Sequence, residues 1–322
     1  YEIRLSLVGS EMCIRDSAKT MNQTFNPELP VGEYARIYIQ TGAVRNQGLE
    51  LALNYNNTWK DFTWNTGVTY SMNKNKILTL ADNAINPITH DKFSISSLNM
   101  GGLGSTRFIL KEGGSMGDIY SLMDLKRDAN GAVYIDENNS VVTESLEANN
   151  YIKLGSVLPK GNLAWRNNFS WKNINVAFLV SARLGGVVFS RTQAVLDNFG
   201  VSEASAAARD KGYVSVNGND RVNPEGWYSV VAGGTAVPQY YIYSATNIRL
   251  QEASIGYTIP RKWLGNVCDI KVSLIGRNLW MIYNKAPFDP ESVASTDNFY
   301  QGIDYFMMPS LRNIGFNLSF KF

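Results

Sequence analysis

Acidic residues that lie close together are the first candidates for chemistry in this chain. Asp128, Asn130, Asp136 and Glu137 carry the oxygen atoms that calcium prefers. They lack the complete ligand spacing of a twelve-residue calcium loop, and Asp-x-Asn-Gly is a good β-turn sequence. We therefore interpret this segment as a turn, and the sequence predicts no metal site.

A second acidic pair, Asp289 and Glu291, is spaced closely enough for general acid and base catalysis. Pro290 lies between the two residues, which favours a turn over the opposed carboxylates of a glycosidase. His90 is the single histidine of the chain, so a catalytic triad or a histidine-based zinc site lacks partners. The sequence predicts no catalytic residue, no enzymatic activity and no cofactor.

Aromatic side chains in long connecting segments are the remaining candidates, as contacts for a ligand. Sugar rings stack on aromatic faces, and the predicted ligand contacts lie in or near the last two long connections. These contacts are Trp227, Tyr228, Tyr240, Tyr241, Phe299, Tyr300 and Tyr305. The alternative for each residue is packing within a loop or a place in an aromatic girdle, since Trp and Tyr are typical of membrane interfaces.

The last segment of the chain indicates the kind of element that holds these loops. In the closing segment 311–322, every second residue from Ile314 to Phe322 is apolar, and polar residues or glycine lie between them. Successive side chains of a strand point to opposite faces, so this strand has one apolar and one polar face. The chain ends on an aromatic residue, Phe322. We interpret the segment as the closing strand of an outer-membrane barrel, with Trp64, Trp165 and Trp171 of earlier strands on the lipid face or in the girdle.

Alternation of the same kind predicts nine strands, joined in turn by short and long connections. The short connections are 57–60, 111–115, 172–173 and 261–266, and the long ones are 74–101, 128–158, 186–242 and 284–309. Long loops are uncommon in compact soluble domains, whereas outer-membrane barrels combine short periplasmic turns with long extracellular loops. The predicted fold is therefore all-β, the C-terminal portion of a transmembrane antiparallel up-and-down β-barrel. Within the longest loop, residues 202–209 are expected to form a short helix.

Composition argues against a nucleic-acid-binding protein and against a disulfide-stabilised protein. Charged residues make up 18% of the 322 residues and the formal net charge is +2, which does not favour a nucleic-acid partner. Residues 1–17 look like a translated sequencing-adapter string and are expected to be non-native. Without them Cys268 is the single cysteine, which leaves no disulfide framework.

Several short motifs follow one another along residues 40–322. They include Asn-x-Gly-x-Glu at 46–50, and the others lie at 155–159, 168–173, 247–250, 254–260, 276–279, 289–291 and 317–320. In this order and spacing the chain resembles the C-terminal half of the SusC/RagA-type TonB-dependent outer-membrane transporters of Bacteroidetes. The sequence departs from many relatives at 128–150, where they carry a longer Asp- and Gly-rich stretch.

The resemblance implies a 22-stranded barrel in the bacterial outer membrane, with a plug domain energised through TonB. Such a barrel imports glycan or peptide fragments together with a SusD-like surface lipoprotein. Residues 18–322 are then expected to be a truncated barrel portion that lacks the plug.

Two alternatives remain open at this point. A passive porin or a siderophore-receptor barrel would share the strand pattern, and upstream plug residues would distinguish these cases. A soluble carbohydrate-binding β-sandwich would instead turn Phe316, Leu318 and Phe320 towards a core.

Overall fold

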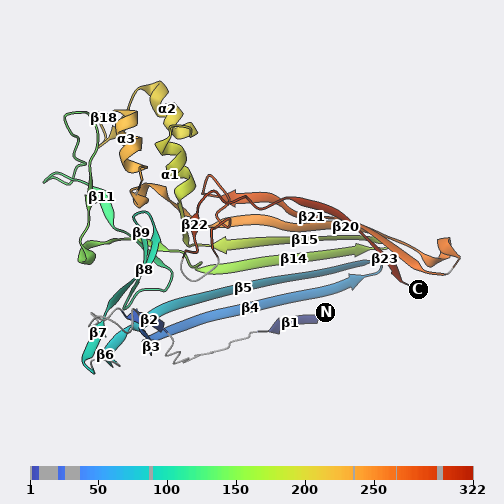
Figure 1. The fold of residues 1–322 in the computed structure, drawn as a ribbon. Helices are drawn as coiled ribbons and strands as arrows, with labels where there is room; N and C mark the ends of the chain where they lie inside the picture. Colours follow the sequence, from blue (N-terminus) through green and yellow to red (C-terminus); the bar gives the residue numbers. More distant parts are fainter. Residues whose placement is uncertain are drawn as a thin grey trace.

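The computed structural model describes residues 2–6, 21–25, 37–86, 90–234, 236–265, 267–295 and 300–321. Its main feature is one eight-stranded sheet in the order β1-β4-β5-β14-β15-β20-β21-β23, in which neighbours are antiparallel. Figure 1 shows these long strands side by side, with the helices and many of the short strands gathered at one end. We call this end the cap end.

The strands of this main sheet are long enough to span a membrane. They are β1 (Glu2–Ser6), β4 (Ala43–Trp59), β5 (Phe62–Thr79), β14 (Gly161–Trp171), β15 (Ile174–Leu184), β20 (Asn247–Ile259), β21 (Asp269–Asn284) and β23 (Asn313–Lys321). A tilted transmembrane strand needs about 9–11 residues. Strand β23 has the minimum of that range, β1 is shorter, and all the others meet or exceed it. Short connections at 60–61, 172–173 and 260–268 alternate with long ones at 80–160, 185–246 and 285–312. The predicted partial barrel and its alternating loops are confirmed.

Two of the nine predicted strands lie outside the main sheet. Segments 103–110 and 116–126 are predicted as barrel strands, but the structure places 106–110 and 118–121 in a separate four-stranded sheet, in the order β13-β10-β9-β8, and 123–125 in a two-stranded sheet with residues 143–145. The strands of the four-stranded sheet are β8 (Ser97–Leu103), β9 (Thr106–Lys111), β10 (Asp118–Ser121) and β13 (Ile152–Ser156). β9 and β10 are too short to cross a bilayer. The predicted polar connection 74–101 is also wrong in part, because β5 continues to Thr79.

The remaining elements belong to the connections. The strands are β2 (Met21–Phe25), β3 (Ile37–Thr41), β6 (Ala81–Ile85), β7 (Lys92–Ile95), β11 (Met123–Leu125), β12 (Thr143–Ser145), β16 (Val187–Ser190), β17 (Val214–Val216), β18 (Asp220–Val222), β19 (Ile242–Ser244) and β22 (Ile303–Asp304). The helices are α1 (Arg191–Asn198), α2 (Glu203–Lys211), α3 (Pro224–Val231) and the 3₁₀ turns η1 (Ala148–Asn150), η2 (Pro238–Tyr241) and η3 (Arg261–Leu264).

Helix α2 confirms the helix predicted at 202–209. The Ser202 side chain accepts a hydrogen bond from the backbone N–H of Ser205, and Gly212 ends the helix in the left-handed conformation. None of the helices in the described ranges is both long enough and apolar enough to cross a membrane.

A hydrophobic core lies within the long connections and not against the main sheet. Phe108 comes from connection 80–160, Phe189 from 185–246 and Ile303 from 285–312, and all three are almost fully buried in one cluster. Strand β22 also pairs with β16 in parallel, which joins the second and third connections. The long connections therefore pack into one body, which we call the cap.

The main sheet has one apolar and one polar face, as the alternation predicts. Directly paired residues lie on the same face, and one such row runs Phe316, Leu274, Ile255, Val176 and Phe169 across five strands. The described part of the chain leaves this face open, and the Phe316 side chain is 81% exposed. A soluble sandwich would bury these side chains, so the face is suited to lipid. Trp165 and Trp171 are exposed on the same face.

A charge on this face is expected to destabilise the membrane-inserted protein. Phe316→Arg should lower the free energy of unfolding in lipid vesicles by about 2–4 kcal/mol, because the cation would enter hydrocarbon. The control is Asn317→Arg on the opposite face of β23, which should change the stability far less. Urea unfolding followed by tryptophan fluorescence measures both, and equal losses would contradict the assignment of faces.

Candidate functional site

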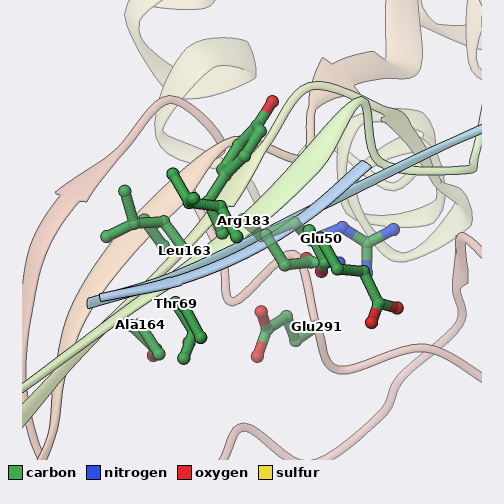
Figure 2. Close-up of a pocket in the computed structure, with 13 residues that line it drawn as sticks. Glu50, Thr69, Leu163, Ala164, Arg183 and Glu291 are labelled. Carbon is green, nitrogen blue, oxygen red and sulfur yellow. The ribbon is translucent and has the colours of Figure 1, made fainter. Parts of the chain in front are cut away.

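The polar face of the main sheet carries a pocket of about 480 Å³ near the cap end. Two paired rows form it, Glu50–Ser71–Asn162–Arg183 and Ala52–Thr69–Ala164–Ser181, and Glu291 approaches from connection 285–312. Figure 2 shows Thr69, Ala164 and Glu291 on one side of the sheet and Leu163 on the other. We call this site the wall pocket. Its small floor residues, Ala52 and Ala164, leave the space that the longer polar side chains surround.

Arg183 is the cation of the wall pocket. Its Nη2 donates a hydrogen bond to the backbone carbonyl of Val157 at 2.8 Å, and Val157 is buried in the cap core. This bond fixes the guanidinium group at the junction between β15 and the cap. The buried Nε atom has no hydrogen-bond partner among the described residues. Since buried polar groups normally have partners, Nε–H is a donor that a bound polar group or a water can satisfy.

A network around Arg249 holds Glu291 at the wall pocket. The Arg249 side chain is 5% exposed, and its Nη2 lies 2.8 Å from Asp289 Oδ1 and 3.1 Å from Glu291 Oε2. Ser310 donates a hydrogen bond to the other oxygen of Asp289, and Asn247 Nδ2 donates one to Glu291 Oε1. Asp289 and Glu291, the acidic pair considered for catalysis in the sequence analysis, therefore both form ion pairs with Arg249. This geometry anchors connection 285–312 on β20.

The position of Arg249 depends on an irregularity in β20. Residues Ala253 and Ile255 lie on the apolar face, and continued alternation would place Arg249 there as well. Between Glu252 and Leu250 the register shifts, so that Gln251 is extra and Leu250 returns to the apolar face opposite Val180. Such a bulge reverses the alternation of the strand. Arg249 consequently pairs with Ser181 on the polar face.

The pKa of Asp289 reflects these contacts. Burial acts to raise the pKa, but hydrogen bonds from Ser310, Arg249 and the Glu291 backbone, together with the charge of Arg249, outweigh it. The pKa of Asp289 therefore lies below its ordinary value, and the carboxylate form is the one that the network stabilises.

The cap carries a second hollow, of about 670 Å³, between its three α-helices. Asp197 lies in its wall and is nearly buried. The carboxylate accepts hydrogen bonds from Gln193 Nε2 at 2.9 Å and from the Tyr241 hydroxyl at 3.0 Å. Tyr228 and the strongly exposed Phe199 also line this hollow, which we call the cap cleft.

The predicted ligand-contact aromatics occupy several environments. Trp227 packs edge-to-face on Tyr240 at 5.3 Å between ring centroids, and Tyr240 is partly exposed. Tyr228 lines the cap cleft, whereas Tyr241 is 3% exposed, and its burial raises the pKa of the hydroxyl. In connection 285–312 two further rings are exposed, and Phe299 lies outside the described residues. These two rings are Tyr300, which packs on Phe108, and Tyr305, which packs on Phe306.

The acidic segment 128–137 forms turns. Asp128 Oδ1 accepts hydrogen bonds from the backbone N–H groups of Asn130 and Ala132, and Asp136 Oδ1 accepts the equivalent bonds from Asn138 and Ser140. Each aspartate is thereby used to close its own turn. Within the described ranges, no group of three or more His, Cys, Asp or Glu side chains is placed to hold a metal ion.

Sequence reasoning did not single out Arg183 or Arg249. Their positions in strands were visible, but the depth of each side chain depends on the cap and on connection 285–312. One signal was available for Arg249, namely the change in phase of the alternation between Leu250 and Ala253. A phase change inside a strand predicts a bulge, and bulges often occur beside functional sites.

Loss of the Arg249 side chain is expected to release connection 285–312. Arg249→Met should destabilise the protein by about 3–5 kcal/mol, because it leaves the buried carboxylate of Asp289 without its cation. The control is Arg277→Met, since Arg277 is exposed and, among the described residues, forms its ion pair with Glu252, and exposed pairs contribute about 0–1 kcal/mol. Urea midpoints and limited proteolysis at 285–312 give the comparison. Equal effects of both variants would contradict the network.

The same network predicts a dependence on acid pH. The lowered pKa of Asp289 contributes stability that is fully present above the unfolded-state pKa, about 3.9, and is lost as pH falls through the lower folded-state value. Cleavage in 285–312 should therefore increase only below about pH 4. Asp289→Ala should show the increased cleavage already at neutral pH. Cleavage that rises between pH 7 and 5 in the unmodified protein would count against this explanation.

Comparison with known proteins adds a family context. No family model matches the chain. TonB-dependent receptor P3 of Formosa agariphila is 25% identical over 333 residues, which cover 91% of this chain and 30% of the receptor. TonB-dependent receptor P26 of the same organism is 27% identical over 303 residues, which cover 87% of this chain and 29% of that receptor. The chain thus spans about a third or less of the relatives that it matches.

Solved structures show the same fold. The RagAB peptide importer in its closed-closed state matches with a TM-score of 0.65 and 16% identity, over 94% of this chain and 32% of the matched chain. The open-open state matches with a TM-score of 0.63 and 16% identity, over 94% of this chain and 31% of that chain. These comparisons confirm the resemblance stated above: in sequence this chain is similar to a portion of TonB-dependent receptors, which are outer-membrane proteins, and in fold it is similar to a portion of the RagAB importer.

Proposed function

We propose that this chain supplies part of the barrel wall and extracellular cap of a receptor that imports glycan or peptide fragments. The import is energised through TonB, and a SusD-like surface lipoprotein is the partner. The observation that carries this proposal is the match to TonB-dependent receptors over about 90% of the chain. The same match favours an energised receptor over a passive porin. The chain contributes binding and passage and carries out no enzymatic reaction.

The arrangement of the two faces supports this function. The apolar face is suited to lipid, so the polar face is turned to the interior of the barrel. The wall pocket opens on the polar face at the cap end, where a solute from outside would arrive. Its position next to the cap makes it suitable as a binding step between the extracellular loops and the interior.

The chemistry of the wall pocket fits a polar, neutral or zwitterionic ligand. Arg183 offers a cation and a free N–H donor, and Glu50 and Glu291 offer carboxylates. Ser71, Asn162 and other hydroxyl and amide groups complete the lining. Sugar hydroxyls and peptide amides both donate and accept hydrogen bonds, so each class can be held by such a set. One of the matched structures is named as a peptide importer, and we retain both classes for this chain.

The loop aromatics extend the proposed binding surface outward. Trp227, Tyr228, Tyr240, Tyr300 and Tyr305 present at least part of a ring outside the core, and flat rings stack on sugars or on peptide side chains. Tyr241 and Phe299 complete the proposed set, although Tyr241 is covered in the described conformation. Exposed apolar residues of the cap, Phe199 and Val201 among them, are suited to contact with the surface lipoprotein.

Filling the wall pocket is expected to reduce uptake. Ala164→Trp, in the full receptor that contains this chain, should weaken binding of the imported fragment about tenfold, which corresponds to about 1.4 kcal/mol. Ala177→Trp is the matched control, because Ala177 lies on the same polar face beside Asn168 and Ser254 and outside the pocket.

The measurement is uptake of fluorescent peptide and oligosaccharide libraries by cells that express each variant. Selective loss with Ala164→Trp supports the proposal and identifies the ligand class. Unchanged uptake, or uptake that persists when TonB is removed, would overturn it.

A further inference from the structure

The apolar face of the main sheet carries a groove of about 590 Å³. It lies on the opposite side of the sheet from the wall pocket and is lined by residues of four strands. Its side walls are large apolar residues, namely Val176, Phe178, Val180, Leu250, Ile255, Leu274, Leu279, Trp280, Ile282 and Ile314. No charged side chain lines it. We call it the membrane-face groove.

Small residues at the centre of one paired row create the floor of the groove. This row runs Phe178, Ala253, Gly276 and Ile314 across β15, β20, β21 and β23. The next row towards the short turns consists of larger side chains, those of Val176, Ile255 and Leu274. The surface is therefore lowered at Ala253, whereas the Leu279 side chain fills the space above Gly276.

The irregularities of β20 and β21 shape the upper part of the groove. β21 has an extra residue between Arg277 and Trp280, and Asn278 adopts a φ of 51°. This path brings the Leu279 side chain onto Gly276, where a β-carbon would collide with it. Trp280, which is 62% exposed, forms one side wall of the groove. The shape of the groove thus depends on the backbone path of β21, which positions Leu279 and Trp280, and on the small side chain of Ala253.

The groove is elongated along the strands. Its lining on β21 extends from Leu274 to Ile282, which at about 3.3 Å per residue is a length on the order of 25 Å. Transmembrane strands are tilted by roughly 35–45°, so the groove runs obliquely across the membrane in the general direction of lipid chains. Trp280 and Ile282 line the groove near the cap end of β21, whereas Val176 lies near the short turn at 172–173, so the groove extends from the middle of the span into its extracellular half.

The surroundings decide what fills such a groove. Water is excluded because the lining offers it no polar side-chain partners apart from Ser254, which belongs to the opposite face. An empty groove would deprive its walls of dispersion contacts on one side. A hydrocarbon chain restores those contacts, and the outer membrane surrounds this face with such chains.

We propose that the membrane-face groove binds one acyl chain of an outer-leaflet lipid as a retained, structural ligand. The proposal rests on the membrane position of the sheet and is independent of the imported solute. The bound chain packs on Ala253 and against Leu279, and it lies between Phe178 and Trp280. By filling the depression beside the bulges, it stabilises the part of β20 that carries Arg249 on the other face.

The test is native mass spectrometry of the full receptor, purified from outer membranes and washed in mild detergent. The unmodified protein should retain one lipid per receptor at this groove after the annular lipids are removed. Ala253→Phe fills the floor and should reduce the retained population at least tenfold. Val272→Phe is the matched control on the same face of β21, outside the groove, and should leave the population unchanged.

Equal retention in all three proteins, or equal loss in both variants, would overturn the proposal, because the lipid would then be annular or bound elsewhere. A retained mass that matches the lipid anchor of a lipoprotein would overturn the assignment to an outer-leaflet lipid. If Ala253→Phe does not assemble, Ala253→Leu is used in its place, and crosslinking of a photoreactive lipid to the peptide containing Trp280 is the second readout. Absence of that crosslink in the unmodified receptor also counts against the proposal.

Discussion

The pairing register of the main sheet is the constraint on which the rest of the structure depends. In hydrocarbon every backbone N–H and C=O must be paired within the protein, and the pairing also decides which side chains share a face. A slip of one residue exchanges the two faces. In β20 the alternation of apolar and polar residues reverses, and the bulge at Gln251 keeps the apolar residues on the apolar face on both sides of that reversal. Arg249 reaches the polar face and Leu250 the apolar face only because this extra residue is present.

Two opposite surfaces are therefore linked by one local distortion. On the polar side, the bulge brings Arg249 to Asp289 and Glu291, and so positions connection 285–312 beside the wall pocket. On the apolar side, the neighbouring distortion of β21 places Leu279 over Gly276 and leaves Trp280 exposed as a wall of the groove. A regular sheet would have neither the buried arginine nor the groove. The irregular segment of these two strands contains most of what is specific to this portion of the barrel.

Much of the main sheet could be predicted from the sequence, because lipid on one side imposes a strict period of two. Strand β23, the turn at 172–173 and the lipid-side position of Trp165 all follow from that period, and the turn predicted at 57–60 is found at 60–61 because β4 continues to Trp59. The assignment of β9 and β10 does not follow, since alternation shows that a segment is a strand and not which sheet it joins. Arg183 and Arg249 were missed for a related reason: their burial depends on residues far away in the chain, such as Val157 and Asp289.

The shared core of the cap has a consequence for how such receptors diversify. Phe108, Phe189 and Ile303 come from three different connections and fill one interior, so this interior is not complete within any one of the three connections. Exchange of one connection for that of a relative would leave the other two facing a surface of the wrong shape. The connections at 80–160, 185–246 and 285–312 are thus expected to vary together as one inherited module, with new surface residues tolerated and new core residues acquired only in matched sets.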